Sequence, residues 1–284
     1  MMKKIFLFVA VAAMSIAASA TELFNGSHHV TWDTPLNIEA ANFADAQPGQ
    51  KIVVTFTDAS DGIEFKLLEV WEHLAGSRES AWISGNGTYQ QYLTEAAVTG
   101  LKAHGLQVIG ANFNCSKVEL LDDGHAMKEG TTVWTGFFWA DSWNTLELYA
   151  ESYNSIDFNS VSAIRFYSEA TSGEYVLNFL KGFGEGEKFA DQTNMTDGEG
   201  YKELVLTDQL RTAVAEANHW MIQFNKEGLA PFNVTDIVLV PKSGGTTAID
   251  NANANAKAVK SIRNGQVLIR KGDKIYNAQG IELK

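Results

Sequence analysis

Two stretches of the chain close in nearly the same way: Phe113–Leu120 reads FNCSKVEL, and Phe232–Leu239 reads FNVTDIVL. Apolar and polar residues alternate along much of both, as they do in a half-buried strand. Upstream, four further segments recur in the same order at an offset of about 110 residues, and such a repeat fixes an architecture before local propensities are considered. They pair Leu23–Gly26 with Val133–Gly136, Leu36–Ile38 with Leu146–Leu148, Ile52–Phe56 with Ser162–Phe166, and Leu93–Thr94 with Leu206–Thr207. The body is therefore predicted to be an internal duplication.

Each repeated unit is predicted to be mostly β-structure. Runs rich in β-branched and aromatic residues, separated by clusters of Gly, Asp, Asn and Ser, indicate short strands; in the first unit they are Lys51–Thr57, Phe65–Val70 and Gln107–Gly110. One short helix is expected in each unit, at Thr94–His104 and from Thr207 onward, where a threonine cap precedes an apolar face. The fold class is all-β: two tandem jelly-roll or β-sandwich domains plus a small C-terminal β-meander.

The two units resemble the galactose-binding-like jelly-roll modules of proteins secreted by gut Bacteroidetes. The resemblance covers residues 21–242 and lies in three features: an opening Leu/Val-aromatic-x-Gly, the strand that starts at Lys51, and the closing Phe-Asn-x-Ser/Thr-x-Val/Ile-x-Leu. The closing strand also resembles the last strand of several carbohydrate-binding module families. The resemblance implies a glycan-binding function, and no catalytic domain accompanies the modules.

The first twenty residues are predicted to be a secretory signal peptide that is cleaved after Ala20. Two lysines precede an apolar run at Ile5–Ala13, and Ala18-Ser19-Ala20 is a small-x-small cleavage site. The run is too short to span about 30 Å of hydrocarbon, so no transmembrane segment is expected. The predicted organisation is a signal peptide at 1–20, module 1 at 21–123, module 2 at 124–242, a flexible linker at 243–258 and a C-terminal tail at 259–284.

The tail is predicted to be a small meander of strands at Gln266–Arg270, Lys274–Asn277 and Ile281–Leu283. Its position, basic charge and the step Ile275–Gly280 resemble the C-terminal sorting tails of Bacteroidetes type IX secretion cargo. This resemblance implies that the secretion machinery is a partner and that the protein is secreted or held on the outer cell surface. A plain solvated β-appendage is the alternative.

Charge and cysteine content exclude several classes of function. The 284 residues carry a formal charge of -12, so the average surface field repels nucleic acid. The charge is uneven, because residues 257–284 hold seven basic and two acidic residues. The only cysteine is Cys115, which excludes an intramolecular disulfide and a CxxC site. Uncharged glycans are the polysaccharide or oligosaccharide partners that this acidic body favours.

Aromatic side chains supply the candidate binding site. Pyranose rings stack on indole and phenol rings, while neighbouring polar groups bind their hydroxyls. The segment Glu69–Trp82 offers this combination, and its second-unit counterpart, Lys181–Phe189, has phenylalanines in place of tryptophans. The candidate ligand-binding residues are Trp71, Glu72, His73, Arg78, Glu79, Trp82, Trp139, Phe183 and Phe189.

The remaining tryptophans are assigned to packing. Phe24/Trp134 and Trp32/Trp143 recur at equivalent positions of the duplication, as a core requirement would produce, and Trp220 lies in an apolar strand. Trp71 and Trp82 stand among polar residues and are expected to be exposed. Of Phe138 and Trp139, alternation predicts that one faces outward.

No enzyme motif of the GxSxG, HExxH, P-loop or GxGxxG type is present. We therefore expect a non-catalytic glycan-binding protein without a cofactor. A surface structural or adhesion protein that binds another protein is the first alternative, and a glycoside hydrolase or polysaccharide lyase on a jelly roll is the second. Structural calcium is an option at Asp58, Asp61, Asp122 and Asp123, although turn formation explains these residues better.

Overall fold

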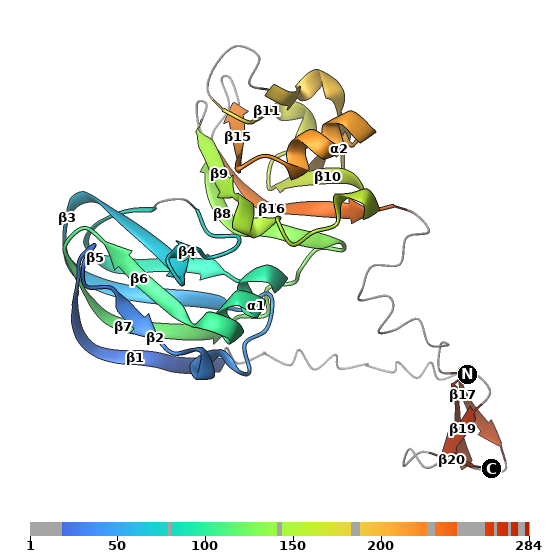
Figure 1. The fold of residues 1–284 in the computed structure, drawn as a ribbon. Coiled ribbons are helices and arrows are strands. Elements are labelled where there is room, and N and C mark those ends of the chain that lie inside the picture. The colour runs from blue at the N-terminus through green and yellow to red at the C-terminus, as the bar shows by residue number, and fades with distance from the viewer. Residues whose placement is uncertain are drawn as a thin grey trace, which may run out of the picture.

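The computed structural model describes residues 19–78, 81–140, 144–182, 188–225 and 231–242, together with the backbone of four short strands between residues 259 and 283. It confirms the all-β class: antiparallel sheets build both modules, and each module carries one α-helix (Figure 1). Neither helix is long or apolar enough to cross a membrane. Residues 1–18 of the predicted signal peptide (1–20) and the linker at 243–258 lie outside the described residues, and Ser19 and Ala20 are the first residues of the first strand.

Module 1 is built from seven strands and one helix. These are β1 (Ser19–Val30), β2 (Leu36–Ile38), β3 (Lys51–Glu69), β4 (Glu72–His73), β5 (Ala81–Tyr92), α1 (Glu95–His104), β6 (Leu106–Gly110) and β7 (Phe113–Asp122), with a 3-10 turn η1 (Ala40–Phe43). Along the main path the strands are ordered β1-β7-β3-β6-β2, and β4 and β5 also pair with β3. The Thr94 hydroxyl caps α1 by accepting the Ala97 N–H at 3.2 Å.

Strand β3 joins both layers of the module 1 sandwich, whereas the sequence predicts two separate strands there. Its first half, Lys51–Thr57, pairs with β7, and its second half, Phe65–Leu68, pairs with β6. Between the halves, register shifts against β5 mark a bend, and Asp58 and Gly62 adopt φ of 58° and 67°. Bulges and left-handed residues let one strand turn from one sheet to the other.

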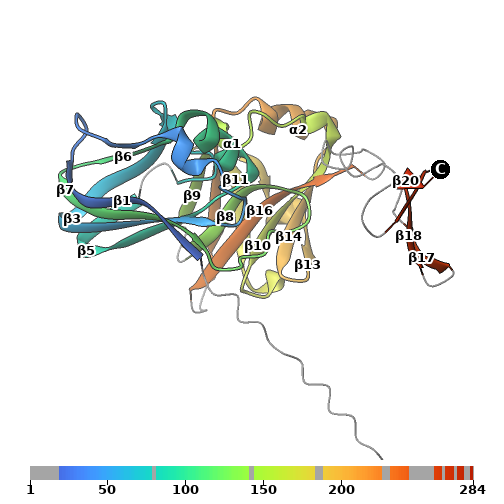
Figure 2. The same cartoon turned by 90° about the horizontal axis from the view of Figure 1, so that it is seen from below.

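Module 2 repeats this plan with more interruptions. Its elements are β8 (Thr131–Ala140), β9 (Thr145–Tyr149), η2 (Ala150–Ser152), η3 (Phe158–Ser160), β10 (Val161–Ser168), η4 (Ser172–Glu174), β11 (Val176–Leu180), β12 (Lys188–Asp191), η5 (Gln192–Asn194), β13 (Met195–Gly198), β14 (Tyr201–Val205), α2 (Asp208–Ala215), β15 (His219–Asn225) and β16 (Phe232–Pro241). Its sheets have the orders β13-β14-β10-β16-β8 and β12-β11-β15-β9. Figure 2 shows β16, β10, β14 and β13 beside one another.

The two modules share the same strand order, as the predicted duplication requires. The sequence β5-β3-β7-β1 in module 1 corresponds to β14-β10-β16-β8 in module 2, and β5-β3-β6-β2 corresponds to β12-β11-β15-β9. Phe24 pairs with Val118 as Trp134 pairs with Ile237, in agreement with the sequence match. The single long β3 of module 1 is therefore replaced in module 2 by two separate strands, β10 and β11.

One sequence match has the wrong register. The alignment set Ile52–Phe56 against Ser162–Phe166, but Ile52 pairs with Leu120 and Ile164 pairs with Leu239. Because Leu120 and Leu239 end the matched closing strands, Ile52 corresponds to Ile164. The error is two residues, and a slip of two keeps the same side chains facing the core, so hydrophobic pattern alone does not reveal it.

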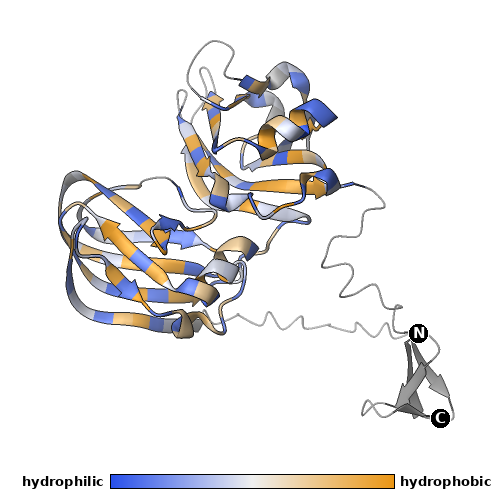
Figure 3. Ribbon diagram, in the orientation of Figure 1, coloured by the Kyte–Doolittle hydropathy of each residue, from blue (hydrophilic) through white to orange (hydrophobic). Residues whose placement is uncertain are grey.

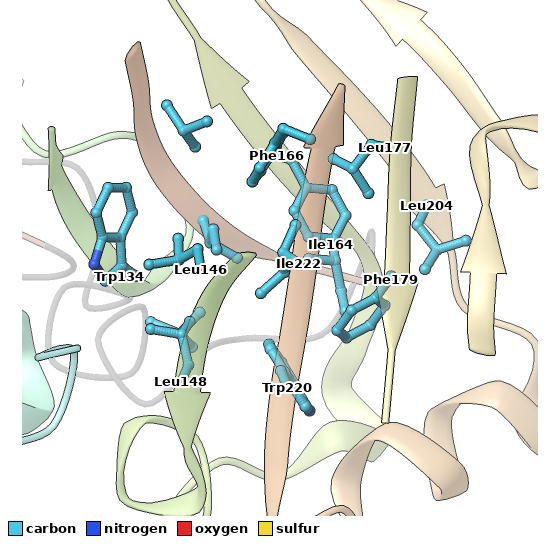
Figure 4. Packing of buried hydrophobic residues seen from close by; sticks show 14 of the residues in the cluster. Trp134, Leu146, Leu148, Ile164, Phe166, Leu177, Phe179, Leu204, Trp220 and Ile222 are labelled. Carbon is cyan, nitrogen blue, oxygen red and sulfur yellow. The ribbon is translucent and has the colours of Figure 1, made fainter. Parts of the chain in front are cut away.

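Each module has its own apolar core, and hydrophobic and hydrophilic residues alternate along many strands (Figure 3). Trp220 is fully buried, as predicted; its ring stacks on Tyr153 with centroids 4.1 Å apart, and Nε1 donates to the Val214 carbonyl. Figure 4 shows Trp220 close to Phe179 in this core, with ring centroids 5.2 Å apart. Trp134 is also buried, and Phe24 is half-buried against the module 1 core.

The assignment of Trp32 to the core was wrong, and Trp143 lies outside the described residues. Trp32 is 41% exposed because it follows the end of β1, in a turn closed by the Thr31 and Thr34 hydroxyls. The tail forms the expected meander with one additional strand: β17 (Val259–Arg263), β18 (Gln266–Lys271), β19 (Lys274–Asn277) and β20 (Glu282–Leu283) pair in order. Its sorting role remains a prediction.

Replacing Trp220 by alanine is expected to destabilise the protein by about 3–5 kcal/mol, because a large buried ring leaves a cavity, and the Val214 carbonyl loses its donor as well. The free energy of unfolding, measured by urea denaturation, checks this value. Trp139→Ala is the matched control in the same module, since its ring is 57% exposed; a change of similar size in both variants would contradict the core assignment.

Candidate functional site

The outer face of the second half of β3 carries the strongest candidate site. Phe65 and Leu67 are buried in the core, so the alternate residues Glu64 and Lys66 point to the opposite side. Trp82 on β5 lies directly across from Glu64 in the ladder and is 68% exposed. Its ring therefore stands on the outer face beside a pair of charged side chains.

Lys66 connects this strip to a second tryptophan. Its Nζ lies 3.1 Å from Glu64 Oε1 and 6.0 Å from the centroid of the Trp32 ring. The contact with Trp32 is at the outer limit of a cation–π interaction. A lysine held between a carboxylate and an indole is oriented along the sheet surface, which leaves its remaining N–H groups for a ligand.

A third tryptophan enters from the turn between β3 and β4. Trp71 has a left-handed backbone with φ of 69° and is 61% exposed. Its backbone N–H donates to Gln107 Oε1 at 2.8 Å, and Gln107 Nε2 donates to Asn37 Oδ1 at 3.0 Å. Gln107 faces outward because Leu106 and Val108 are buried, so this chain of hydrogen bonds lies on the same outer face as Lys66.

We call this surface the tryptophan face, made of Trp32, Asn37, Glu64, Lys66, Trp71, Trp82 and Gln107. Exposed large apolar side chains grouped in this way mark interaction sites. Along β3, Glu64 lies beside Trp82, and Glu69 lies two residues before Trp71. At about 3.3 Å per residue, the two points are about 16 Å apart along the strand. The face suits an extended ligand of several units and offers rings for stacking and polar groups for hydroxyls.

The middle of the predicted binding segment lies elsewhere, at the contact between the modules. The His73 ring stacks on Tyr149 of β9, with centroids 4.2 Å apart and planes 14° apart. The Arg78 guanidinium lies 5.2 Å from the centroid of Phe138. Between them, the buried Gly76 N–H donates to Ser152 Oγ at 2.9 Å. The segment is therefore divided: its tryptophans face solvent, and its centre joins module 1 to module 2.

Glu72 completes the placement of this segment, and Glu79 lies outside the described residues. Glu72 is exposed at a cleft of about 620 Å³ between the modules, which Glu69 and Glu151 also line. Burial, followed by the nearby Glu151 carboxylate, raises the pKa of Glu69 to about 7. Burial also raises the pKa of Glu151, with a further contribution from Glu72. An Oε2 atom of both Glu69 and Glu151 is buried without a partner among the described residues.

A second cluster fixes the connection between the modules. Tyr92 donates to Asp123 Oδ2 at 2.7 Å, and Lys51 Nζ lies 2.9 Å from the same oxygen. Burial opposes ionisation of Asp123, but the hydrogen bonds from Lys51 and Tyr92 outweigh it and hold the pKa below its usual value. The His125 ring lies 4.4 Å from that of Tyr92 and bonds to Thr135 Oγ1 at 2.8 Å. The chain between β7 and β8 is thus anchored to both modules.

The predicted module 2 residues do not gather into one site. Trp139 faces outward and is 57% exposed, while Phe138 is buried, as alternation predicted for one of the pair. Phe189 is half-buried, and its ring packs 4.8 Å from that of Phe179, so it belongs to the core of module 2. Phe183 lies outside the described residues.

The sequence reasoning missed five members of the tryptophan face: Trp32, Asn37, Glu64, Lys66 and Gln107. Trp32 was assigned to the core because it recurs with Trp143 in the repeat. A usable signal existed for Lys66, since Phe65 and Leu67 flank it and alternation turns it outward. Asn37 and Gln107 come from strands far apart in the chain, and only the pairing of β2 with β6 brings them together.

Among the described residues, no group of three or more His, Cys, Asp or Glu side chains is arranged to hold a metal ion. Asp58 accepts hydrogen bonds from Thr57 and Asn114, and Asp122 accepts one from the Gly124 N–H. These contacts are those of turn-forming residues. The side chain of Asp61 lies outside the described residues.

Comparison with solved structures gives a weak likeness. No family model and no curated protein matches the chain. Among solved structures, a match is to SGBP-B of the Bacteroides ovatus mixed-linkage glucan utilization locus, in complex with a mixed-linkage heptasaccharide. It has a TM-score of 0.32 and 21% identity over 36% of this chain and 30% of the other. The functional argument for this chain therefore rests on its own geometry.

The stability of the protein is expected to fall as the pH rises from about 4.5 to about 7. Folding raises the pKa of Glu69 to about 7, so the folded state binds its proton more tightly than the unfolded chain, and the associated stability is lost as pH passes through that value. Glu69→Gln should flatten this part of the profile and raise the melting temperature at pH 8. Thermal unfolding at a series of pH values measures both effects.

Glu199→Gln, on an exposed turn, is the control and should keep the wild-type profile. A Glu69→Gln variant whose melting temperature falls with pH as steeply as that of the wild type would contradict the role of this carboxyl group.

Proposed function

We propose that the protein is a non-catalytic glycan-binding protein of the cell surface or the extracellular space, and that the tryptophan face of module 1 binds an extended polysaccharide chain. The observation that supports this most is the grouping of three exposed indoles around a hydrogen-bonded polar strip on one sheet. The sugar face stacks on an indole, and the hydroxyls at its edge bond to lysine, carboxylate and amide groups.

The class of ligand follows from the shape and charge of the face. An open sheet surface does not enclose the end of a chain, so it favours internal units of a linear polymer. Glu64 and Lys66 neutralise each other at 3.1 Å, and the chain as a whole carries -12, so an acidic polymer gains nothing from this surface. A neutral polysaccharide is the ligand that we propose.

A second candidate function is glycan hydrolysis at the cleft between the modules. Its support is the raised pKa of Glu69 beside a second glutamate, because such pairs serve as acid and base in glycosidases. The Oε2 atoms of Glu69 and Glu151, however, are buried and have no partner in the described part of the chain, which favours carboxyl groups enclosed by the contact between the modules. Reducing ends released during prolonged incubation with a bound glycan, and absent with Glu69→Gln, would establish hydrolysis.

Trp82→Ala and Trp71→Ala are each expected to weaken polysaccharide binding at least about tenfold, since exposed aromatic anchors dominate the binding energy of such surfaces. Affinity electrophoresis in gels that contain β-glucan, xylan, mannan or α-glucan measures the retardation. The melting temperature should stay near that of the wild type, because both rings are mostly exposed.

Trp139→Ala is the matched comparison, because it removes an equally exposed indole from module 2. It should leave the retardation unchanged. If wild-type protein is retarded and the Trp71 and Trp82 variants are retarded equally, the tryptophan face is not the site; if no polysaccharide retards the wild type, a protein ligand becomes the leading alternative.

A further inference from the structure

Module 2 contains a polar cavity that neither the sequence pattern nor the tryptophan face accounts for. Its volume is about 700 Å³, within the range of pockets that hold small ligands. It lies where η4 and β11 approach β13 and β14, and the residues that matter for its chemistry are Tyr175, Asn178, Asp191, Asp197, Lys202 and Asn225. We call it the module 2 pocket.

A buried lysine forms one wall of the module 2 pocket. Lys202 is only 5% exposed, and burial of a lysine is costly unless the charge is paired. Its Nζ lies 2.6 Å from Asp197 Oδ1 and 4.9 Å from the centroid of the Tyr175 ring. The Asp197 side chain is 52% exposed, so the pair runs from the interior to the mouth of the cavity. An ammonium group has three N–H donors, and Asp197 occupies one.

Two amide groups in the pocket are available to a ligand. Asn178 and Asn225 come from the paired strands β11 and β15, and Asn225 is only 8% exposed. Neither side chain forms a hydrogen bond with another residue in the described part of the chain. Polar side chains in enclosed positions are normally hydrogen-bonded, so two free amides in one cavity indicate groups that are arranged for a polar guest.

The same pocket contains a carboxylate, Asp191, whose position is fixed by hydrogen bonds from Thr193. Asp191 lies opposite Asn178 in the ladder, and its Oδ1 accepts the Thr193 N–H at 2.9 Å and the Thr193 hydroxyl at 2.6 Å. These hydrogen bonds from Thr193 lower the pKa of Asp191, so its second oxygen is a charged acceptor. The pocket thus combines ammonium and amide donors with carboxylate and amide acceptors, the set that recognises neighbouring hydroxyl groups.

We propose that the module 2 pocket binds a short neutral sugar, one or two units long, through hydrogen bonds rather than by stacking. A sugar cannot stack on Tyr175, the aromatic residue among the described residues that line the pocket, because Tyr175 is 3% exposed and Lys202 covers its ring. An acidic sugar is disfavoured, since Lys188 and Lys202 face three carboxylates, of which Asp197 is already paired with Lys202. The inference rests on the proposed glycan-binding function and adds a second site that recognises chain ends or small fragments.

Isothermal titration calorimetry tests the module 2 pocket. The full chain is titrated separately with cellobiose, laminaribiose, mannobiose, maltose and lactose. We expect at least one disaccharide to bind, and we expect Asn178→Ala and Lys202→Met each to weaken it at least tenfold. Trp82→Ala, on the tryptophan face, should leave this affinity unchanged. Asn178→Ala removes no internal hydrogen bond among the described residues, so it stays informative if Lys202→Met lowers the melting temperature.

The inference is overturned if no disaccharide binds, or if binding survives Asn178→Ala and is lost with Trp82→Ala. Long polysaccharides separate this failure from failure of the proposed function. If a polysaccharide retards the wild type but no disaccharide binds, only the proposal for the module 2 pocket is contradicted. Disaccharide binding at the pocket without polysaccharide retardation would contradict the proposed role of the tryptophan face and support the proposed role of the pocket.

Discussion

The structure of module 1 depends on the register of strand β3 on both sides of its bend. Because one strand belongs to both layers, its register fixes which side chains enter the core in each of them. Phe65 and Leu67 bury themselves, and Glu64 and Lys66 must then face outward beside Trp82. A shift of one residue would bury the charged pair and expose the phenylalanine. The core and the candidate binding surface are thus two sides of a single constraint.

The contact between the modules uses a different kind of chemistry from either core. The imidazole of His73 stacked on Tyr149, a buried hydrogen bond from Gly76 to Ser152, and partly buried carboxyl groups are found there, whereas apolar aliphatic and aromatic side chains fill each sandwich. Polar contacts of this kind specify an orientation but lose strength when their protonation changes. Because the pKa of Glu69 at this contact is raised to about 7, we expect the stability of the contact between the modules to depend on pH.

The repeat, the all-β class and both helix caps could be predicted from the sequence, because they depend on local pattern and on self-similarity. Exposure of Trp71 and Trp82 was predicted from their polar neighbours and is confirmed. The membership of the site was not predictable in full. Trp32 shares its recurrence with core residues, and the hydrogen bond between Gln107 and Asn37 joins strands 70 positions apart. Local sequence does not predict a contact that forms only when distant strands pair in the folded sandwich.

The pairing of the first strand of each module with its last has a consequence for how the chain folds. Phe24 pairs with Val118, and Trp134 with Ile237. Neither sandwich can therefore close until its last strand has been synthesised and can pair with its first. Contacts so distant in sequence slow folding, because the entropy of a long loop is lost before any contact compensates for it. Each module is therefore expected to remain open throughout its synthesis and to close in one late step, with module 1 completed before the last strand of module 2 exists.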